Sequence, residues 1–424
     1  MALEAKRLRA IIGGSAGNLV EWYDWYAYSA LSLYFSASFF PKGDPTAQLL
    51  NTSAVFAVGF FMRPIGAYLM GRYADRHGRK AGLAVSVALM CAVSLMIAFA
   101  PTYATIGIAA PILLLVARLL QGLSVGGEYG ASATYLSEMA TRRHRGFWSS
   151  FQYVTLIGGM LSALAVTLLL QAVFTKAQMD SFGWRIAFAL GAALALGVYL
   201  LRRGLAETAS FRALAVDRPA SGMAALWRAH PREFLLVGAI SAGGGLAFYA
   251  YTTYMQKFLA NTVGFSVQTA TAIMTAALVV FMLVQPLFGA LADRVGRKPM
   301  LLLFGIGGAI VSVPVFSALE NVRTPGAAFA IVLVPLLLLA AYTSISALVK
   351  AELFPAHIRA LGVAFPYAIG NAAFGGTAEY VALSLKGWHM ESAFYWYVSG
   401  MLALTSLCFW LLPETRRTSL IVED

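Results

Sequence analysis

Residues 71–80 have the sequence GRYADRHGRK, and residues 289–298 have the closely similar sequence GALADRVGRK. The second copy begins 218 residues after the first, which is close to half of the 424-residue chain. In each copy a glycine permits a sharp turn, and an aspartate stands beside the turn, where the N-terminus of a neighbouring helix would favour a negative charge. We expect charged residues of both copies to act as gating residues at one end of the molecule, and these are Asp75, Arg79, Asp293 and Arg297.

A second loop pattern repeats at nearly the same interval. Glu138 is followed seven residues later by Arg145, and Glu352, 214 residues beyond Glu138, is followed seven residues later by Arg359. Two independent motifs that recur at half the chain length predict that the two halves share one architecture. We expect these four residues to act as gating residues as well. The simpler alternative is that the first motif only anchors the chain at a membrane surface through its basic residues, although an anchor needs neither the aspartate nor the glycines.

The composition excludes a soluble enzyme. Hydrophobic residues make up 59% of the chain and charged residues only 12%, about half of the roughly 25% that is usual in soluble domains. Runs of about 20 apolar residues predict membrane spans, and the lack of alternating polar and apolar residues favours helices over barrel strands. The expected fold is an all-α membrane protein with twelve transmembrane helices in two six-helix repeats, centred on residues 11–38, 52–73, 81–100, 106–137, 147–173, 184–201, 233–259, 267–291, 299–319, 326–349, 360–384 and 391–412.

Basic residues are distributed unequally between the two sides of these spans. One side carries 23 of the 31 Lys and Arg residues, and the other side carries five. Because basic loops remain in the cytoplasm, we expect both termini to be cytoplasmic. The basic residues form no continuous patch for nucleic acid, and membrane lipids with anionic headgroups are their expected partners. The 23 residues lie in segments 6–9, 72–80, 142–145, 202–232, 294–298, 350–359 and 416–417.

The longest polar stretch, residues 202–232, separates span six from span seven. We therefore expect an N-terminal six-helix bundle (1–201), a cytoplasmic linker (202–232) and a C-terminal six-helix bundle (233–424). Both cysteines lie in apolar runs, so no disulfide framework is expected. No histidine falls within a span and no ATPase motif occurs. We expect no metal and no cofactor, so an ion gradient must drive any accumulation of a solute.

At these motifs the sequence resembles the major facilitator superfamily, and within it the metabolite:proton symporters, over nearly the whole chain. The stretches at 17–24 (GNLVEWYD), 62–66 (MRPIG) and 121–130 (QGLSVGGEYG) are shared across the symporters. The stretches at 251–257 (YTTYMQK) and 374–381 (FGGTAEYV) are similar to bacterial α-ketoglutarate permeases. The resemblance implies a secondary active transporter of the bacterial inner membrane that imports α-ketoglutarate or a related dicarboxylate with protons, by alternating access.

The resemblance leaves other substrates open, namely citrate, shikimate or a zwitterionic osmolyte, and it leaves open a receptor that binds without transport. Osmolyte transporters carry a long C-terminal coiled-coil extension that this sequence does not show, which weighs against an osmolyte. Trp25 stands where such permeases more often have Phe, and Pro366 stands early in span eleven, so the resemblance says less about the geometry near both. A monomer is expected, since two six-helix halves suffice to enclose a pathway.

Seven ionisable side chains remain within the predicted spans. An ionised group at the centre of a bilayer costs roughly 2.5–3.5 kcal/mol on insertion scales, so each one needs a partner or a water-filled cavity. A site between the two halves near the middle of the membrane is expected for a transporter built from such repeats. The seven are Glu21, Asp24, Arg63, Arg118, Glu128, Lys257 and Glu379.

Glu21 and Asp24 are three residues apart and share one face of span one. Two carboxylates this close repel each other, which favours protonation of one of them, and this property suits a proton-coupling group. The alternative is that they form structural hydrogen bonds with neighbouring helices.

Arg118 shares a helix face with Gln121, and the resemblance implies a role in proton movement or in binding a carboxylate through two parallel hydrogen bonds. A structural pair with Glu21, Asp24 or Glu128 is the alternative. Arg63 is a second candidate for the substrate. Its neighbour Pro64 is expected to break the helix, and the Arg-Pro-Ile-Gly segment is equally well interpreted as a packing device.

Lys257, together with Tyr249, Tyr251 and Tyr254, forms a polar and aromatic strip that is suited to grip a carboxylate. The alternative is that Lys257 extends to the membrane interface. Glu128 lies among small residues that favour close packing of helices. For Glu379 the sequence does not separate packing from function.

Overall fold

The computed structural model describes residues 2–41, 45–77, 79–126, 129, 133, 137, 142–203, 223–355 and 358–421, with side chains described outside 2–16, 71–84, 142 and 201–225. Within these residues all regular secondary structure is helical.

The described part of the first half forms six long helices and several short ones. In chain order these are α1 (Ala2–Phe39), α2 (Pro45–His77), α3 (Arg79–Ala98), α4 (Tyr103–Ile106), α5 (Ala109–Val125), η1 (Arg142–His144), α7 (Arg145–Ser149), α8 (Phe151–Val173), α9 (Lys176–Gln178), the π-helical turn η2 (Met179–Gly183) and α10 (Trp184–Arg203).

The second half follows the same plan. Its helices are α12 (Met223–Ala229), α13 (Pro231–Tyr249), the π-helical turn η3 (Ala250–Tyr254), α14 (Met255–Asn261), α15 (Val267–Val295), α16 (Arg297–Glu320), α17 (Pro325–Glu352), α18 (Arg359–Gly370), the π-helical turn η4 (Asn371–Gly375), α19 (Ala378–Gly387), α20 (Glu391–Leu411) and α21 (Thr415–Thr418).

In the described residues, each of the twelve predicted spans contains a helix or a run of joined helices, and the fourth span is described as a helix only as far as Val125. Eight helical segments of the described part are long and apolar enough to cross a membrane, and Val85–Ala98 and Ala109–Val125 are shorter apolar helices. The outer surface is also apolar: Leu287 and Ile310 keep 68% and 67% of their surface exposed. Arg118, Lys257 and Asp24 are buried instead. This inverted distribution of polar and apolar side chains suits a lipid solvent.

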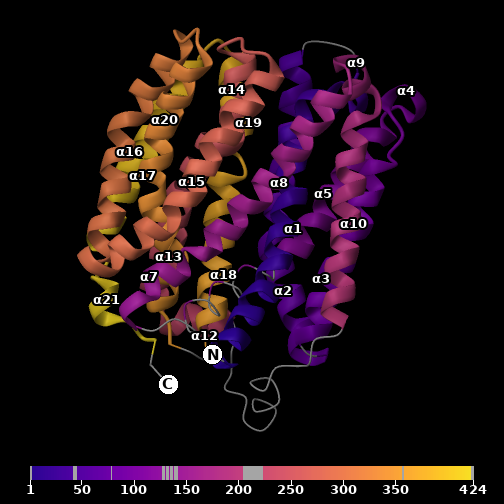
Figure 1. Cartoon of the computed structure of the whole chain (residues 1–424). Coiled ribbons are helices and arrows are strands. Elements are labelled where there is room, and N and C mark those ends of the chain that lie inside the picture. The colour runs from indigo at the N-terminus through magenta and orange to yellow at the C-terminus, as the bar shows by residue number, and fades with distance from the viewer. Residues whose placement is uncertain are drawn as a thin grey trace.

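The two halves pack by the same set of helix contacts, which confirms the predicted internal repeat. In the first half α1 packs on α8 and α10, α2 on α3 and α5, and α3 on α5 and α10. In the second half α13 packs on α18 and α20, α15 on α16 and α17, and α16 on α17 and α20. The halves lie side by side in Figure 1 and meet symmetrically, with α8 against α15 and α2 against α18 and α19.

The prediction that Pro64 breaks a helix is wrong, because α2 continues through it, as α18 continues through Pro366. The irregularities of the second half lie at η3 and η4, in the seventh and eleventh spans. A π-helical turn shifts the register of the side chains that follow it and often marks a functional site.

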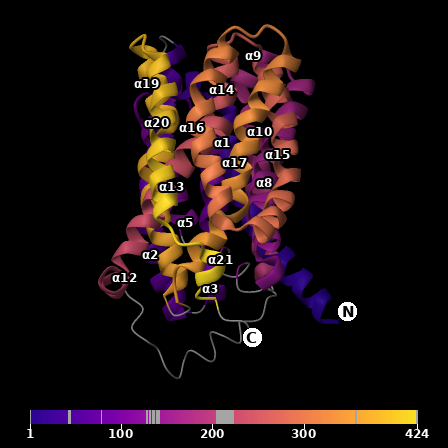
Figure 2. The ribbon, with the colours of Figure 1, turned by 90° about the vertical axis from the view of Figure 1, so that its left-hand side faces the viewer.

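The start of α1 and the short helix α21 lie at the same end of the bundle, below called the lower end because it is at the bottom of Figures 1 and 2. The connection between α15 and α16 is also there. It turns at Gly296, whose φ of +105° is a conformation that favours glycine, as the loop motif predicts. Its counterpart Gly78 lies outside the described residues.

Candidate substrate-binding site

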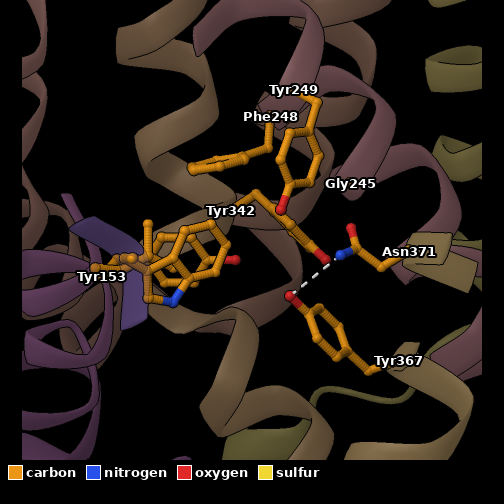
Figure 3. A pocket seen from close by; sticks show the side chains of 9 residues that line it. Tyr153, Gly245, Phe248, Tyr249, Tyr342, Tyr367 and Asn371 are labelled. Atoms are coloured by element: carbon orange, nitrogen blue, oxygen red, sulfur yellow. Dashed lines mark hydrogen bonds between the residues drawn. The ribbon is translucent and has the colours of Figure 1, made fainter. Parts of the chain in front are cut away.

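Two small cavities lie between the halves. The first is shown in Figure 3, where the side-chain amide of Asn371 donates a hydrogen bond of 3.5 Å to the hydroxyl of Tyr367. Its wall is mainly aromatic and comes from α1, α8, α13, α17, α18 and η4. The lining residues are Trp22, Tyr153, Leu156, Gly245, Phe248, Tyr249, Tyr342, Tyr367 and Asn371.

The second cavity shares Trp22 and Tyr367 with the first and adds charged groups from the first half. It is lined by Glu21, Trp22, Arg63, Val125, Gly126, Tyr129, Ala364, Tyr367 and Ala368. Each cavity has a volume of about 10 Å³, which is close to the least that holds one water molecule. A dicarboxylate therefore fits only after the two halves have moved apart.

Arg63 is buried at the second cavity and stacks on aromatic rings. Its guanidinium carbon lies 4.0 Å from the ring centre of Trp25 and 4.2 Å from that of Phe60. Its Nε atom has no hydrogen-bond partner among the described residues. The local packing is as close as the sequence suggests, since a Cβ at Gly126 would stand 2.1 Å from the carbonyl oxygen of Arg63.

The guanidinium carbon of Arg118 lies 3.9 Å from the ring centre of the same Trp25, and Arg118 is also buried. It donates a hydrogen bond to the side chain of Gln121, which in turn donates one to the carboxylate of Asp24. The other Asp24 oxygen accepts a hydrogen bond of 2.5 Å from Ser94. Arg118 and Asp24 are thus linked through Gln121, while Nε and Nη2 of Arg118 have no partner in the described part of the chain.

Lys257 forms an ion pair of 2.7 Å with Glu379, and both side chains are buried (0% and 5% exposed). The alternative that Lys257 extends to the interface is therefore wrong. Ser29 accepts a second hydrogen bond of 2.7 Å from the ammonium, and Ser53 donates one to Glu379. These serines belong to the first half, whereas the ion pair belongs to the second, so the cluster connects the halves.

Tyr251 and Tyr254, predicted to contact the substrate beside Lys257, have hydroxyl groups with other partners. Tyr251 shares a hydrogen bond of 2.6 Å with Ser312, and Tyr254 donates one of 3.4 Å to Glu391. Neither residue lines the two cavities. The structure therefore does not bring the predicted strip together on one ligand position, and a role in substrate binding stays a prediction.

At the lower end, Asp293 joins the halves. Its carboxylate accepts hydrogen bonds of 2.8 and 3.0 Å from the backbone N–H groups of Gly146 and Phe147, at the start of α7 in the first half. This confirms the expected placement of an aspartate at a neighbouring helix N-terminus. Arg297 forms an ion pair of 2.9 Å with Asp293 and lies 3.7 Å from Glu352.

The segment that follows α20 is attached to the same end. Arg145 donates to the hydroxyl of Ser419 (3.4 Å) and the carbonyl of Ile421 (3.3 Å), while Arg359 donates to the carbonyl of Leu420 (2.8 Å). Glu414 accepts from the first two N–H groups of α16. Of the other predicted gating residues, Glu138 and the side chains of Asp75 and Arg79 lie outside the described part.

Lys350 is a buried residue that the sequence pattern places among the basic loops. The structure buries it completely within α17. Tyr342, Ser346 and Lys350 are spaced four residues apart and so share one helix face. That spacing was the available signal that Lys350 faces the interior.

Comparisons with known proteins agree with a transporter built from two similar halves. The sequence pattern of the sugar (and other) transporter family matches residues 10–221 and again residues 220–422. The α-ketoglutarate permease of Escherichia coli is 56% identical over 95% of this chain and 93% of its own length. The citrate-proton symporter of Klebsiella pneumoniae is 30% identical over 94% of this chain and 91% of its own length.

Among solved structures, the xylose transporter XylE from E. coli in a partially occluded inward open conformation is similar in fold. Its TM-score is 0.75 at 20% sequence identity, with 95% of this chain and 97% of that chain covered. A crystal structure of a D-xylose-proton symporter gives the same TM-score and covers 96% of this chain and 98% of that one. The chain belongs to the sugar (and other) transporter family, within the major facilitator superfamily.

Proposed function

We propose that this chain is a proton-coupled symporter that imports α-ketoglutarate, or a closely related dicarboxylate, across the bacterial inner membrane. The observation that carries the proposal is the 56% identity with the E. coli α-ketoglutarate permease over 95% of the chain. The two permease-like stretches, 251–257 and 374–381, contain the two members of the Lys257–Glu379 ion pair.

The charge of the substrate explains the need for protons. Moving one negative charge inward against an inside-negative potential costs about 2.3 kcal/mol per 100 mV, so a dianion costs about twice that. Protons carried in the same direction cancel this cost. The gradient that drives transport is then the proton gradient, and no resident cofactor is required.

Asp24 is the proposed proton-coupling group, with Glu21 as the second candidate. When Asp24 is ionised, its charge balances that of Arg118 through Gln121. Protonation of Asp24 leaves the positive charge of Arg118 without its balancing anion. A substrate carboxylate can then take that place at the Nε and Nη2 groups, which have no hydrogen-bond partner in the described residues, with Arg63 close by on the same Trp25 ring. A carboxylate reaches Lys257 only by replacing Glu379.

Alternating access follows from contacts at both ends. The Lys257–Glu379 cluster with Ser29 connects the halves toward the upper end, where α14 and α19 lie in Figure 1. Asp293 connects them at the lower end. We assign the lower end to the cytoplasm because the basic segments lie there, as the positive-inside rule requires. Lipids surround a monomer in this arrangement.

Uptake into proteoliposomes tests the proposal. Purified protein is reconstituted, a pH gradient (acidic outside) is imposed, and accumulation of labelled α-ketoglutarate is followed against citrate and proline as competitors. We expect accumulation that disappears when a proton carrier collapses the gradient. Accumulation of citrate or proline in place of α-ketoglutarate would contradict the proposed substrate, and accumulation without a gradient would contradict proton coupling.

A further inference from the structure

Lys350 is a buried cation that the proposed cycle does not yet use. It lies two residues before the end of α17, and its side chain is fully buried. Its ammonium group has no hydrogen-bond partner and no ion pair among the described residues. Buried lysines are almost always paired, so this arrangement calls for a functional explanation.

The surroundings of the ammonium group are three tyrosine rings. The Lys350 Nζ atom lies 4.4 Å from the ring centre of Tyr367 and 5.8 Å from those of Tyr129 and Tyr342. Ring faces attract a cation, but more weakly than a carboxylate in direct contact does in a dry site. The group that complements Lys350 best is therefore an anion that can enter and leave.

The same three rings line the cavities between the halves. Tyr342 and Tyr367 line the first cavity, and Tyr129 and Tyr367 line the second. Tyr129 belongs to the first half and stacks on Tyr367 of the second half, with ring centres 3.9 Å apart and planes at 12°. Because one ring belongs to each half, separation of the halves pulls this stack apart and opens the space beside Lys350 to the substrate path.

Two cations of the first half also lie at or near these cavities. Arg63 lines the second cavity, and Arg118 stacks on the same Trp25 ring as Arg63. A dicarboxylate needs one cation for each carboxylate, and Lys257 already has Glu379 as its partner. We propose that Lys350 binds the second carboxylate of the transported dicarboxylate, with the first held by the arginines of the other half.

This inference rests on the proposed function and is tested by a comparison of two substrates. The probes are α-ketoglutarate and 2-oxopentanoate, which has the same carbon chain but a methyl group in place of the distal carboxylate. Uptake constants are measured for the wild type, Lys350→Gln and Lys350→Arg. We expect Lys350→Gln to lower the preference for the dicarboxylate at least tenfold, mainly through KM, as the loss of one buried charge contact implies.

The arginine variant keeps the positive charge, so it should recover part of the preference. Lys176→Gln, which removes an exposed lysine that pairs with Asp180, is the control and should leave both substrates unchanged. Thermal unfolding of each purified variant checks the fold. An equal loss for both substrates, or no loss for either, would overturn the assignment of Lys350. Absence of α-ketoglutarate uptake by the wild type would instead contradict the proposed function itself.

Discussion

Three of the buried positive residues differ in what balances their charge. Arg118 is linked to Asp24 through Gln121 and Lys257 is paired with Glu379, whereas Lys350 lies beside three tyrosine rings and has no hydrogen-bond partner among the described residues. A cation whose charge is balanced internally contributes to closure or coupling, whereas one without such a balance attracts a ligand. The sequence identifies the first two because a charge within a predicted span is costly and therefore conspicuous.

Asp24→Asn tests the coupling role. Asn resembles a permanently protonated Asp24, so the variant should still exchange labelled for unlabelled substrate across the membrane but should lose accumulation driven by a pH gradient. Counterflow and gradient-driven uptake are measured on the same proteoliposomes. Glu320→Gln, at a carboxylate that accepts from Tyr395 at the end of α16, is the matched control. Normal gradient-driven accumulation by Asp24→Asn would rule out Asp24 as the proton carrier.

The Lys257–Glu379 pair should show strong thermodynamic coupling. Removing either partner leaves an uncompensated buried charge, which costs about 3–5 kcal/mol, whereas removing both is often nearly neutral. We expect Lys257→Met and Glu379→Leu each to lower the free energy of unfolding by that amount, and the double variant to recover most of it. Denaturant unfolding of the four proteins gives the coupling energy.

The pair of Lys386 and Glu391, at 3.5 Å and with both side chains 20% exposed, is the natural comparison. Its coupling should be only about 0–1 kcal/mol because solvent screens it. If the two pairs showed the same small coupling, the Lys257–Glu379 bond would have no special role in closing the molecule.

At the scale of helices, prediction from sequence succeeded where one apolar run makes one span. Prediction from sequence failed where contacts between distant segments determine which side chains are buried and where a helix is irregular. The apolar run that predicts the tenth span ends at residue 349, so Lys350 falls in the adjoining loop of the prediction. Two of the tyrosines beside Lys350, Tyr129 and Tyr367, are more than 200 residues apart in the sequence. No local periodicity predicts that their rings stack. The π-helical turns η3 and η4 likewise depend on packing that a hydrophobicity pattern does not encode.

Helices of the two halves approach each other closely at the lower end, where α7 packs on α15. A Cβ at Gly289 would stand 2.4 Å from the carbonyl oxygen of Gly146, and because that atom belongs to the backbone, the helices must separate. Gly289→Ala should therefore favour the state that is open at the lower end. The readout is alkylation of Ala364→Cys, at the second cavity, in a background that lacks Cys91 and Cys408.

We expect faster alkylation in Gly289→Ala. Gly400→Ala is the control, because a Cβ there meets nothing within 4 Å and alanine suits the interior of α20. Equal alkylation rates in the two variants would mean that the contact of α7 with α15 does not keep the cavity closed.

At the scale of the whole molecule, the fold is nearly symmetric but its charges are not. The same six helix contacts recur in each half, so the backbone alone gives no preference for one direction of closure. Hydroxyl groups of two serines of the first half bond to an ion pair of the second half and so connect the halves toward the upper end, while an aspartate and a helix N-terminus connect them at the lower end. The repeat in the sequence predicts the symmetric arrangement of helices, and the buried side chains make the contacts at the two ends of the molecule different.

The attachment of residues 414–421 to both halves has a practical consequence for single-molecule fluorescence measurements. Arg145 of the first half holds Ser419 and Ile421, while Glu414 holds the start of α16 in the second half. Opening of the lower end must break one of these attachments and closing must restore it. A donor dye at Ser419→Cys, with its acceptor dye on the first half, should therefore switch between two efficiencies of energy transfer. The switching frequency should rise with substrate concentration until it equals the turnover number.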